Sequence, residues 1–320
     1  SLRVRLFDGA GGPVGTSFSV PGSVYLSPSI TDLAPDFAVV PLHIASNPNL
    51  WALIHRQNTG TIALRIYNGA NPTFVAQLSL PVGSGLGSID AASLVESVPT
   101  SSQFVVAWRN GGMIQSRRYT YTTPVPSGSG FVSAPTQTVG TVSTGYYDHN
   151  VRVVGLFNGH YMVSWINHLS RLYAREYVPP SSSSAVSPAL IGATQIFTTQ
   201  VTSYAVAPDL GDVVFVGNAG STDASLRRFS ASALSAPVFP LILTGYNAFD
   251  FFSLVPRNPV QGWMTLVYAA RDNLGYGLEV YRLRFNFNSA GGPVVSPPMQ
   301  PAAVATLTRQ LDQYLPVVAQ

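Results

Sequence analysis

The chain has 320 residues, of which 17 are basic and 14 acidic, so charged residues make up only 10% of it. All 17 basic residues are arginines, and cysteine is absent. This composition excludes a coiled coil, a highly charged disordered tail, a disulfide-stapled miniprotein and any cysteine-based zinc or redox site.

The formal net charge is only +3, and the arginines are scattered rather than clustered. Nucleic-acid binding leaves a basic stripe or patch, so we expect no nucleic-acid partner. The uncharged stretch Tyr177–Pro208 is interrupted by Pro179, Pro180 and a run of serines, so we expect no membrane insertion either.

Short runs rich in Val, Tyr, Phe and Thr recur along the chain between Gly, Pro, Asn and Ser, which predicts an all-β protein. One strand of each unit carries an arginine followed two residues later by an aromatic. Two apolar strands precede it and a fourth strand follows. In chain order the expected strands include Arg5–Phe7, Gly15–Val20, Phe37–Leu42, Trp51–His55, Arg65–Tyr67, Phe74–Leu80, Ala91–Val95, Phe104–Trp108, Arg117–Tyr119, Val151–Leu156, Tyr161–Trp165, Arg175–Tyr177, Tyr204–Ala207, Val213–Gly217, Arg227–Phe229, Phe251–Val255, Trp263–Tyr268 and Leu283–Phe285.

The aromatic residues of this step stand 52 to 60 residues apart. Units of that length with four antiparallel strands predict the blades of a β-propeller. The second strands read as nearly continuous apolar runs, as expected where neighbouring blades cover both faces. We therefore expect a single domain over residues 1–320, an all-β, six-bladed β-propeller of four-stranded antiparallel blades. An array of β-sandwiches is the alternative.

One blade is expected to be shared between the two ends of the chain and to be one strand short. The sequence opens at a third strand and closes at a first strand, Tyr314–Gln320, so one second strand is missing from the count. The segment Val304–Leu315 has helical spacing, but Pro316 and the repeat favour two strands there. We hypothesise that the missing strand comes from adjoining chain or from a neighbouring molecule. A degenerate strand that escapes the count is the alternative.

The segments Arg5–Gly15, Phe104–Trp108 and Asp312–Ala319 together resemble the repeat of very large secreted bacterial surface proteins of the RTX and adhesin type. Gly217 and Leu283 depart from the tryptophan and arginine positions of that repeat. The resemblance implies an extracellular or cell-surface, non-catalytic module that forms arrays with copies of itself. It implies no particular ligand.

An aspartate recurs just before the predicted first strands, and a ring of such carboxylates at one mouth of a propeller could bind calcium. The alternative is that each aspartate accepts hydrogen bonds from its own turn or forms an ion pair. None of them has the dense spacing of a calcium loop. These residues are Asp36, Asp90, Asp148, Asp250 and Asp312.

The recurring arginines and aromatics share one face of their strand, so they could bind a glycan between blades. The alternative is structural: each arginine packs its stem against the next blade and pairs its head locally, and each tryptophan belongs to the blade core. The candidate ligand-binding residues are Arg65, Tyr67, Trp108, Arg117, Tyr119, Trp165, Arg175 and Tyr177.

We expect no catalysis. The five histidines lack metal spacing, and none of the three glutamates forms a close acidic pair. Two Pro/Ser/Thr tracts, Thr120–Gly130 and Pro179–Pro188, are O-glycosylation candidates or flexible outer loops.

The sequence thus favours a structural or adhesive extracellular propeller that could serve as one repeating subunit of a surface fibre or array. A lectin with glycan sites between blades is the alternative, and a glycan-active enzyme ranks third.

Overall fold

The structure is a computed structural model that describes residues 2–7, 12–23, 37–58, 60–69, 72–83, 85–98, 101–123, 130–140, 149–156, 159–180, 182, 184–190, 193–209, 212–218, 223–230, 234, 239–243, 246–255, 264–272, 278–287, 293–295 and 302–307. Within these ranges helical geometry is confined to Gly159, which confirms the all-β prediction. None of the described segments is a helix long and apolar enough to cross a membrane.

The chain divides into two compact units. The first holds Ser1–His168 and Arg175–Gly192, and the second holds Leu169–Ala174 and Ala193–Ala319. All described strand pairs of both units are antiparallel, as expected for blades joined by short connections.

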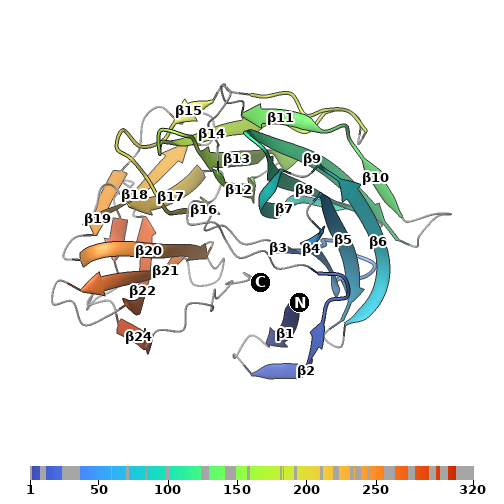
Figure 1. Cartoon of the computed structure of the whole chain (residues 1–320), viewed down its shortest axis with the longest axis horizontal. Coiled ribbons are helices and arrows are strands. Elements are labelled where there is room, and N and C mark those ends of the chain that lie inside the picture. Colours follow the sequence, from blue (N-terminus) through green and yellow to red (C-terminus); the bar gives the residue numbers. More distant parts are fainter. Residues whose placement is uncertain are drawn as a thin grey trace. The chain divides into compact units, whose positions relative to one another are not determined.

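The first unit begins with a hairpin of β1 (Arg3–Phe7) and β2 (Pro13–Ser19). The next sheet has the order β3 (Phe37–Pro41), β4 (Leu50–Asn58), β5 (Thr61–Asn68) and β6 (Thr73–Pro81). The sheet after it contains β7 (Leu86–Val98), β8 (Ser101–Asn110), β9 (Met113–Thr122), β10 (Phe131–Ser133) and β11 (Gln137–Gly140). These strands run from blue to green in Figure 1.

A further sheet has the order β12 (His149–Gly155), β13 (Tyr161–Ile166), β14 (Leu172–Tyr177) and β15 (Thr194–Gln195). The second unit contains the sheet β16 (Tyr204–Asp209), β17 (Asp212–Asn218), β18 (Ala224–Ser230) and β19 (Phe239–Leu243). Its last sheet contains β20 (Tyr246–Val255), β21 (Met264–Asp272), β22 (Leu278–Phe287), β23 (Pro293–Val295) and β24 (Ala302–Leu307).

Two sheets have five strands because their outermost strand is interrupted. β10 pairs with the C-terminal half of β9, and β11 pairs with its N-terminal half. β23 and β24 divide the edge of β22 in the same way. Both of these sheets therefore keep four strand positions, as predicted. The strand β24 also favours a strand over a helix at the start of Val304–Leu315.

The second strands are buried on both faces, as their apolar sequences predict. Every residue of β13 is buried, and β17 is buried from Val213 to Asn218. Each predicted strand with described residues overlaps an observed strand, and many of the observed strands extend three to five residues beyond the predicted ends, as β7 and β22 do. Trp263, which opens the fifth predicted second strand, and Tyr314–Gln320, the expected closing strand, lie outside the described residues.

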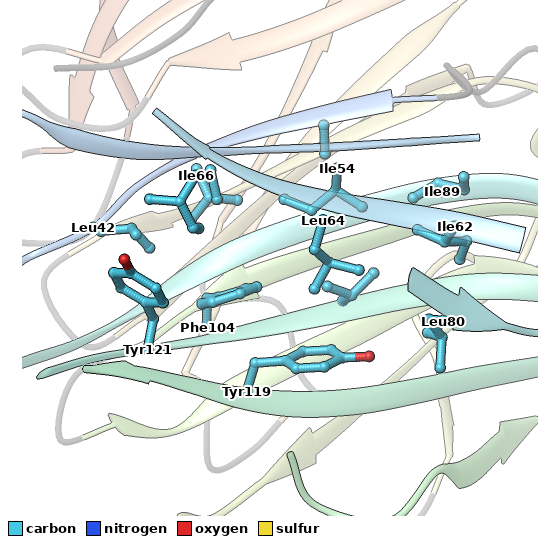
Figure 2. Close-up of a cluster of buried hydrophobic side chains, with 14 of the residues drawn as sticks. Leu42, Ile54, Ile62, Leu64, Ile66, Leu80, Ile89, Phe104, Tyr119 and Tyr121 are labelled. Carbon is cyan, nitrogen blue, oxygen red and sulfur yellow. The ribbon is translucent and has the colours of Figure 1, made fainter. Parts of the chain in front are cut away.

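An apolar layer joins the sheet β3–β6 to the sheet β7–β11. Figure 2 shows Ile54, Ile62, Leu64 and Ile66 of β4 and β5 directed toward Phe104 and Tyr119 of β8 and β9. All of these side chains are completely buried. A second apolar cluster joins the two sheets of the second unit, with Leu226 and Phe285 among its members.

The innermost strands of the first unit also approach one another closely. The Val153 amide of β12 donates to the Asp90 carboxylate of β7 at 2.8 Å. At Gly155 the strands are so close that a Cβ atom would collide with the carbonyl oxygen of Ser93, so only glycine is tolerated there.

Candidate functional site

The recurring aromatic residues pack across their own sheets. In two sheets the partner is the residue directly opposite on the second strand. Such cross-strand ring pairs are a general way of stabilising a sheet, and they recur here with the repeat. The pairs are Tyr67 on Trp51 with ring centroids 4.7 Å apart, Tyr119 on Phe104 at 5.4 Å, and Tyr177 on Tyr161 at 5.0 Å.

The recurring arginines reach out to other segments. Arg65 donates from Nη2 to the Pro21 carbonyl, 2.8 Å away, just beyond β2. In the second unit, Arg227 donates to the Ile196 carbonyl just beyond β15 and lies 4.8 Å from the ring centroid of Phe197. Both arginines tie a third strand to the chain that follows the preceding outer strand.

Arg117 and Arg175 are half-buried. Arg117 donates from Nε to Thr136 Oγ1 at 2.9 Å. Arg175 lies beside Tyr177, whose pKa burial raises to about 12 against the opposing effect of the guanidinium. Burial likewise raises the pKa of Tyr119 to about 12, with Arg117 opposing.

Most of the candidate ligand-binding aromatics are covered by protein in this conformation. Ligand contact by these rings stays a prediction, because stacking on a sugar would require the covering groups to move. Their exposed fractions are 4% for Tyr67, 1% for Trp108, 0% for Tyr119, 3% for Trp165 and 3% for Tyr177.

A different aromatic group surrounds the buried Tyr67 and is partly open to solvent. Trp51, Tyr67 and Phe74 form one row across β4, β5 and β6, because Tyr67 pairs with both of the others. Phe18 of β2 packs on this row, 5.4 Å from Tyr67 and 6.4 Å from Trp51 between ring centroids. Phe74 is 53% exposed, and Phe18 and Trp51 are half-buried. We call these four residues the aromatic row.

The hairpin and the sheet position the aromatic row between them. Leu2, Val4 and Phe18 of the hairpin segment pack with Val20 on the face of the sheet β3–β6 that carries Leu53 and Tyr67. The Trp51 indole donates to the Gly69 carbonyl at 3.3 Å, which fixes the ring plane. Antiparallel register then aligns Tyr67 with Trp51.

Arg65 and His55 occupy the next two rows of the same face. Arg65 lies opposite Leu53, and His55 lies opposite Ala63, so the two side chains are diagonal neighbours. Both residues are more than nine-tenths buried. Burial lowers the pKa of His55, and the positive charge of Arg65 lowers it further against an opposing hydrogen bond to the Arg56 backbone.

The predicted calcium ring is only partly visible. Asp90 lies inside β7 rather than before it, so the expectation that it stands at a strand entrance is wrong. The Asp90 carboxylate accepts a hydrogen bond from the Val153 amide. Burial raises the pKa of Asp90, and the positive charge of Arg152 and the backbone hydrogen bonds oppose this increase. Asp250 likewise lies inside β20 rather than before it, so the same expectation is wrong there, while Asp36, Asp148 and Asp312 fall outside the described residues.

Among the side chains that the structure describes, no group of three or more histidines, aspartates and glutamates is placed to hold a metal ion. Calcium binding by the five aspartates therefore stays a prediction.

A polar layer joins β9 and β11 to β13 and the Pro/Ser tract. Gln137 donates to the Tyr161 hydroxyl at 2.7 Å and to Ser116 Oγ at 3.1 Å. Arg118, which is 3% exposed, donates to the carbonyls of Ser182 and Ala185. The described part of the tract Pro179–Pro188 is thus held to the body of the first unit.

Sequence reasoning found Arg65 and Tyr67 but missed their neighbours Phe18, Trp51 and His55. The alternation Trp51-Ala52-Leu53-Ile54-His55 places the first, third and fifth residues on one face, which was a usable signal. Phe18 could not be found in this way, because its contact crosses from the hairpin to another sheet.

Comparison with known proteins supports the fold. The fucose-recognising, six-bladed β-propeller lectin of the fungus Aleuria aurantia has 11% identity and a TM-score of 0.52, over 94% of this chain and 92% of that chain. A variant of that lectin in complex with Fucα1-6GlcNAc has a TM-score of 0.51 at 11% identity, over 94% and 93% of the two chains. A mutant of AofleA from Arthrobotrys oligospora, with three arginines replaced by alanine, has a TM-score of 0.50 at 10% identity, over 92% and 78%.

Neither a protein-family model nor a curated protein sequence matches the chain, so no family match supports the resemblance to RTX and adhesin repeats. At these identities the likenesses show the fold alone. The chain is a six-bladed β-propeller with four-stranded antiparallel blades, as the sequence predicts.

Proposed function

We propose that this protein is a carbohydrate-binding lectin and that the aromatic row of Phe18, Trp51, Tyr67 and Phe74 is its sugar platform. The observation that carries the proposal is a set of stacked rings left partly open between two elements of a propeller, with Phe74 53% exposed. Large aromatic groups at an open cleft are a general mark of ligand sites, because they offer apolar area without much loss of side-chain entropy.

The chemistry of the row suits a sugar. A pyranose has an apolar C–H face that packs on a ring and hydroxyl groups that need polar partners nearby. Arg65 lies one row away from the rings, and Gln77 of β6 lies opposite it. This arrangement combines ring faces with polar groups on one surface, as sequence reasoning expected of Arg65 and Tyr67.

The likeness to fungal propeller lectins supports this function over a purely structural role. Those lectins bind fucose-containing glycans, and their fold spans 94% of this chain. A non-catalytic role and an extracellular or cell-surface location belong to the same proposal.

A glycan array probed with the full chain tests the proposal. We expect binding to a restricted set of glycans, weakened at least tenfold by Trp51→Ala and by Phe74→Ala. Val75→Ala is the matched control, since it shortens an exposed apolar residue of the same strand beside the row. An array without any binding, or equal losses in all three variants, would overturn the proposal.

An array-forming surface module is the second candidate. Within the described residues β1 is hydrogen-bonded to β2 alone, and an open strand edge favours pairing with another chain. Sedimentation of the full chain over a range of concentrations tests this candidate. A monomer at every concentration would contradict it.

A further inference from the structure

We infer that the niche formed by His55 and Arg65 binds a carboxylate, and hence that the site prefers acidic sugars. This inference rests on the proposed function, because it names the ligand class of the same site. Four observations on the first unit lead to it.

The first observation is a pair of buried nitrogens with unused hydrogen-bonding capacity. Within the described part of the chain, neither Arg65 Nε nor His55 Nε2 has a hydrogen-bond partner, and both atoms are buried. Arg65 Nε is a donor, and an unsatisfied buried donor costs about 1–3 kcal/mol, more when it is charged, so this group calls for an acceptor. His55 Nδ1 carries the hydrogen that it donates to the Arg56 carbonyl, so Nε2 of the neutral ring is an acceptor and becomes a donor only when the ring is protonated. Arg65 Nη2 donates to the Pro21 carbonyl, and His55 Nδ1 lies 2.9 Å from the Arg56 carbonyl.

The second observation is that histidine stands where the repeat has an apolar residue. Trp51 and Phe104 occupy matching positions, since each lies opposite the recurring tyrosine. His55, four residues further on, therefore matches Trp108, which is part of the apolar layer. The matching position holds Trp108 in the next sheet and Tyr268 in the last one, so His55 differs from them as a side chain that becomes positively charged on protonation.

The third observation is the charge of the surroundings. The described residues from Leu2 to Gly83 include Arg3, Arg5, Arg56 and Arg65 and no aspartate or glutamate. The carboxylates of Asp8, Asp32 and Asp36 lie outside the described residues. Arg56 lies on the opposite face of β4, and Arg3 and Arg5 are exposed, so Arg65 is the charge that faces the niche among the described residues. Its positive charge suits a carboxylate better than a neutral hydroxyl group.

The fourth observation is placement. Along β4, the positions facing the hairpin run from Trp51 of the aromatic row, through Leu53, to His55. Residues two apart on a strand are about 6.6 Å apart, so a ring on Trp51 and a carboxylate near Arg65 are within the span of one or two sugar units. Leu53 between them is completely buried under the hairpin segment, so a ligand that reaches Arg65 would have to displace the side chains that cover it. The carboxylate would accept hydrogen bonds from Arg65 Nε and from His55 Nε2 when that nitrogen carries its proton.

A matched pair of ligands tests the inference. Methyl β-D-glucuronide and methyl β-D-glucoside differ only in a carboxylate against a hydroxymethyl group. In calorimetric titrations of the full chain we expect the glucuronide to bind at least tenfold more tightly. Arg65→Met should remove most of this preference at pH 7.5, and His55→Leu should remove the part of the preference that appears at pH 5.5. Arg56→Met is the control, because it removes the same charge from the opposite face of β4, where Arg56 Nη2 donates to the Gly87 carbonyl.

Binding of the carboxylate should be coupled to protonation of His55. Among the described residues, Arg65 on β5 is the charge that acts on His55. Arg56 bonds on the opposite face of β4, Arg3 and Arg5 on β1 are exposed, and the described residues of β2, β3 and β6 carry no charge. A bound carboxylate would therefore raise the pKa of His55, and the preference should grow between pH 7.5 and 5.5 in the wild type but not in His55→Leu. If Arg65→Met fails to fold, the comparison of His55→Leu with the wild type across the pH series still tests whether the niche binds a carboxylate.

The outcomes separate the two proposals. Tight binding of neutral glycans on the array, with acidic glycans bound equally or more weakly, overturns the carboxylate inference and leaves the lectin proposal intact. Acetate that competes as well as the glucuronide shows a carboxylate niche without sugar selection, and it overturns the inference as stated. If water alone fills the niche, the glucuronide is not preferred over the glucoside, and this outcome also overturns the carboxylate inference.

Discussion

The stacked pair of Phe104 and Tyr119 offers a quantitative test of how the repeat stabilises the fold. Both side chains have no solvent exposure, and their ring centroids are 5.4 Å apart. Replacing a buried aromatic by alanine costs about 3–5 kcal/mol, and a stacked pair adds about 0.5–1.5 kcal/mol of coupling. We therefore expect each single alanine variant to lose about 3–5 kcal/mol, and the double variant to lose less than the sum by the coupling energy.

Urea denaturation followed by tryptophan fluorescence measures these losses, and Phe74→Ala, at an exposed position, should change stability by only about 0.5 kcal/mol. A loss below about 1 kcal/mol for Tyr119→Ala, or a coupling near zero, would refute the scaffold role of the pair. Sugar binding lost in Tyr119→Ala at unchanged stability would instead make Tyr119 a ligand residue.

Three further predictions concern the first unit. Burial raises the pKa values of Tyr119 and Tyr177 to about 12, so above pH 10 these tyrosines ionise in the unfolded chain before they ionise in the folded one. In urea titrations, the free energy of unfolding should therefore fall by about 1.4 kcal/mol per pH unit for each tyrosine between pH 10 and pH 12. A free energy of unfolding that does not change over this range would contradict the prediction. Arg118→Ala should release the tract around Ser182 and Ala185 and make it a site of limited proteolysis, read by mass spectrometry, with Arg171→Ala as an exposed control. Gly155→Ala should lower stability by about 1–3 kcal/mol through collision with Ser93, and an unchanged denaturation midpoint would disprove the close approach.

Sequence reasoning located the strands because the propeller repeats one local pattern. The spacing from Arg65 to Arg117, and the apolar runs before each, are set by a blade that buries both faces of its second strand. Fold class and strand order follow from this pattern. The interruption between β10 and β11 does not, since it depends on how the outer edge of one sheet bends.

The candidate site was only half predictable. The Arg-x-aromatic step pointed to Arg65 and Tyr67, but the same step predicted Tyr119 and Tyr177, which lie in buried stacks. Local sequence does not say whether a neighbouring element covers a ring. The exposed Phe74 differs from them because it stands on the outermost strand of its sheet, beyond the buried Tyr67.

The three layers between elements of the first unit show why the departures from the repeat carry more information than the repeat itself. Between the sheets β3–β6 and β7–β11 the filling is apolar, and neither Leu64 nor Phe104 leaves room for a ligand's charge. The layer at Gln137 and Tyr161 is polar, but its hydroxyl and amide groups bond to one another. Beneath the hairpin, the position that holds Trp108 in the next sheet has become His55. Its neighbour Arg65 has a buried Nε without a hydrogen-bond partner among the described residues, as Arg175 also has, so the histidine is what distinguishes this layer. A scaffold needs no charged, unsatisfied niche, because an apolar residue there would be more stable. Retaining one beside open aromatic rings is therefore explained by a ligand that supplies the missing acceptor.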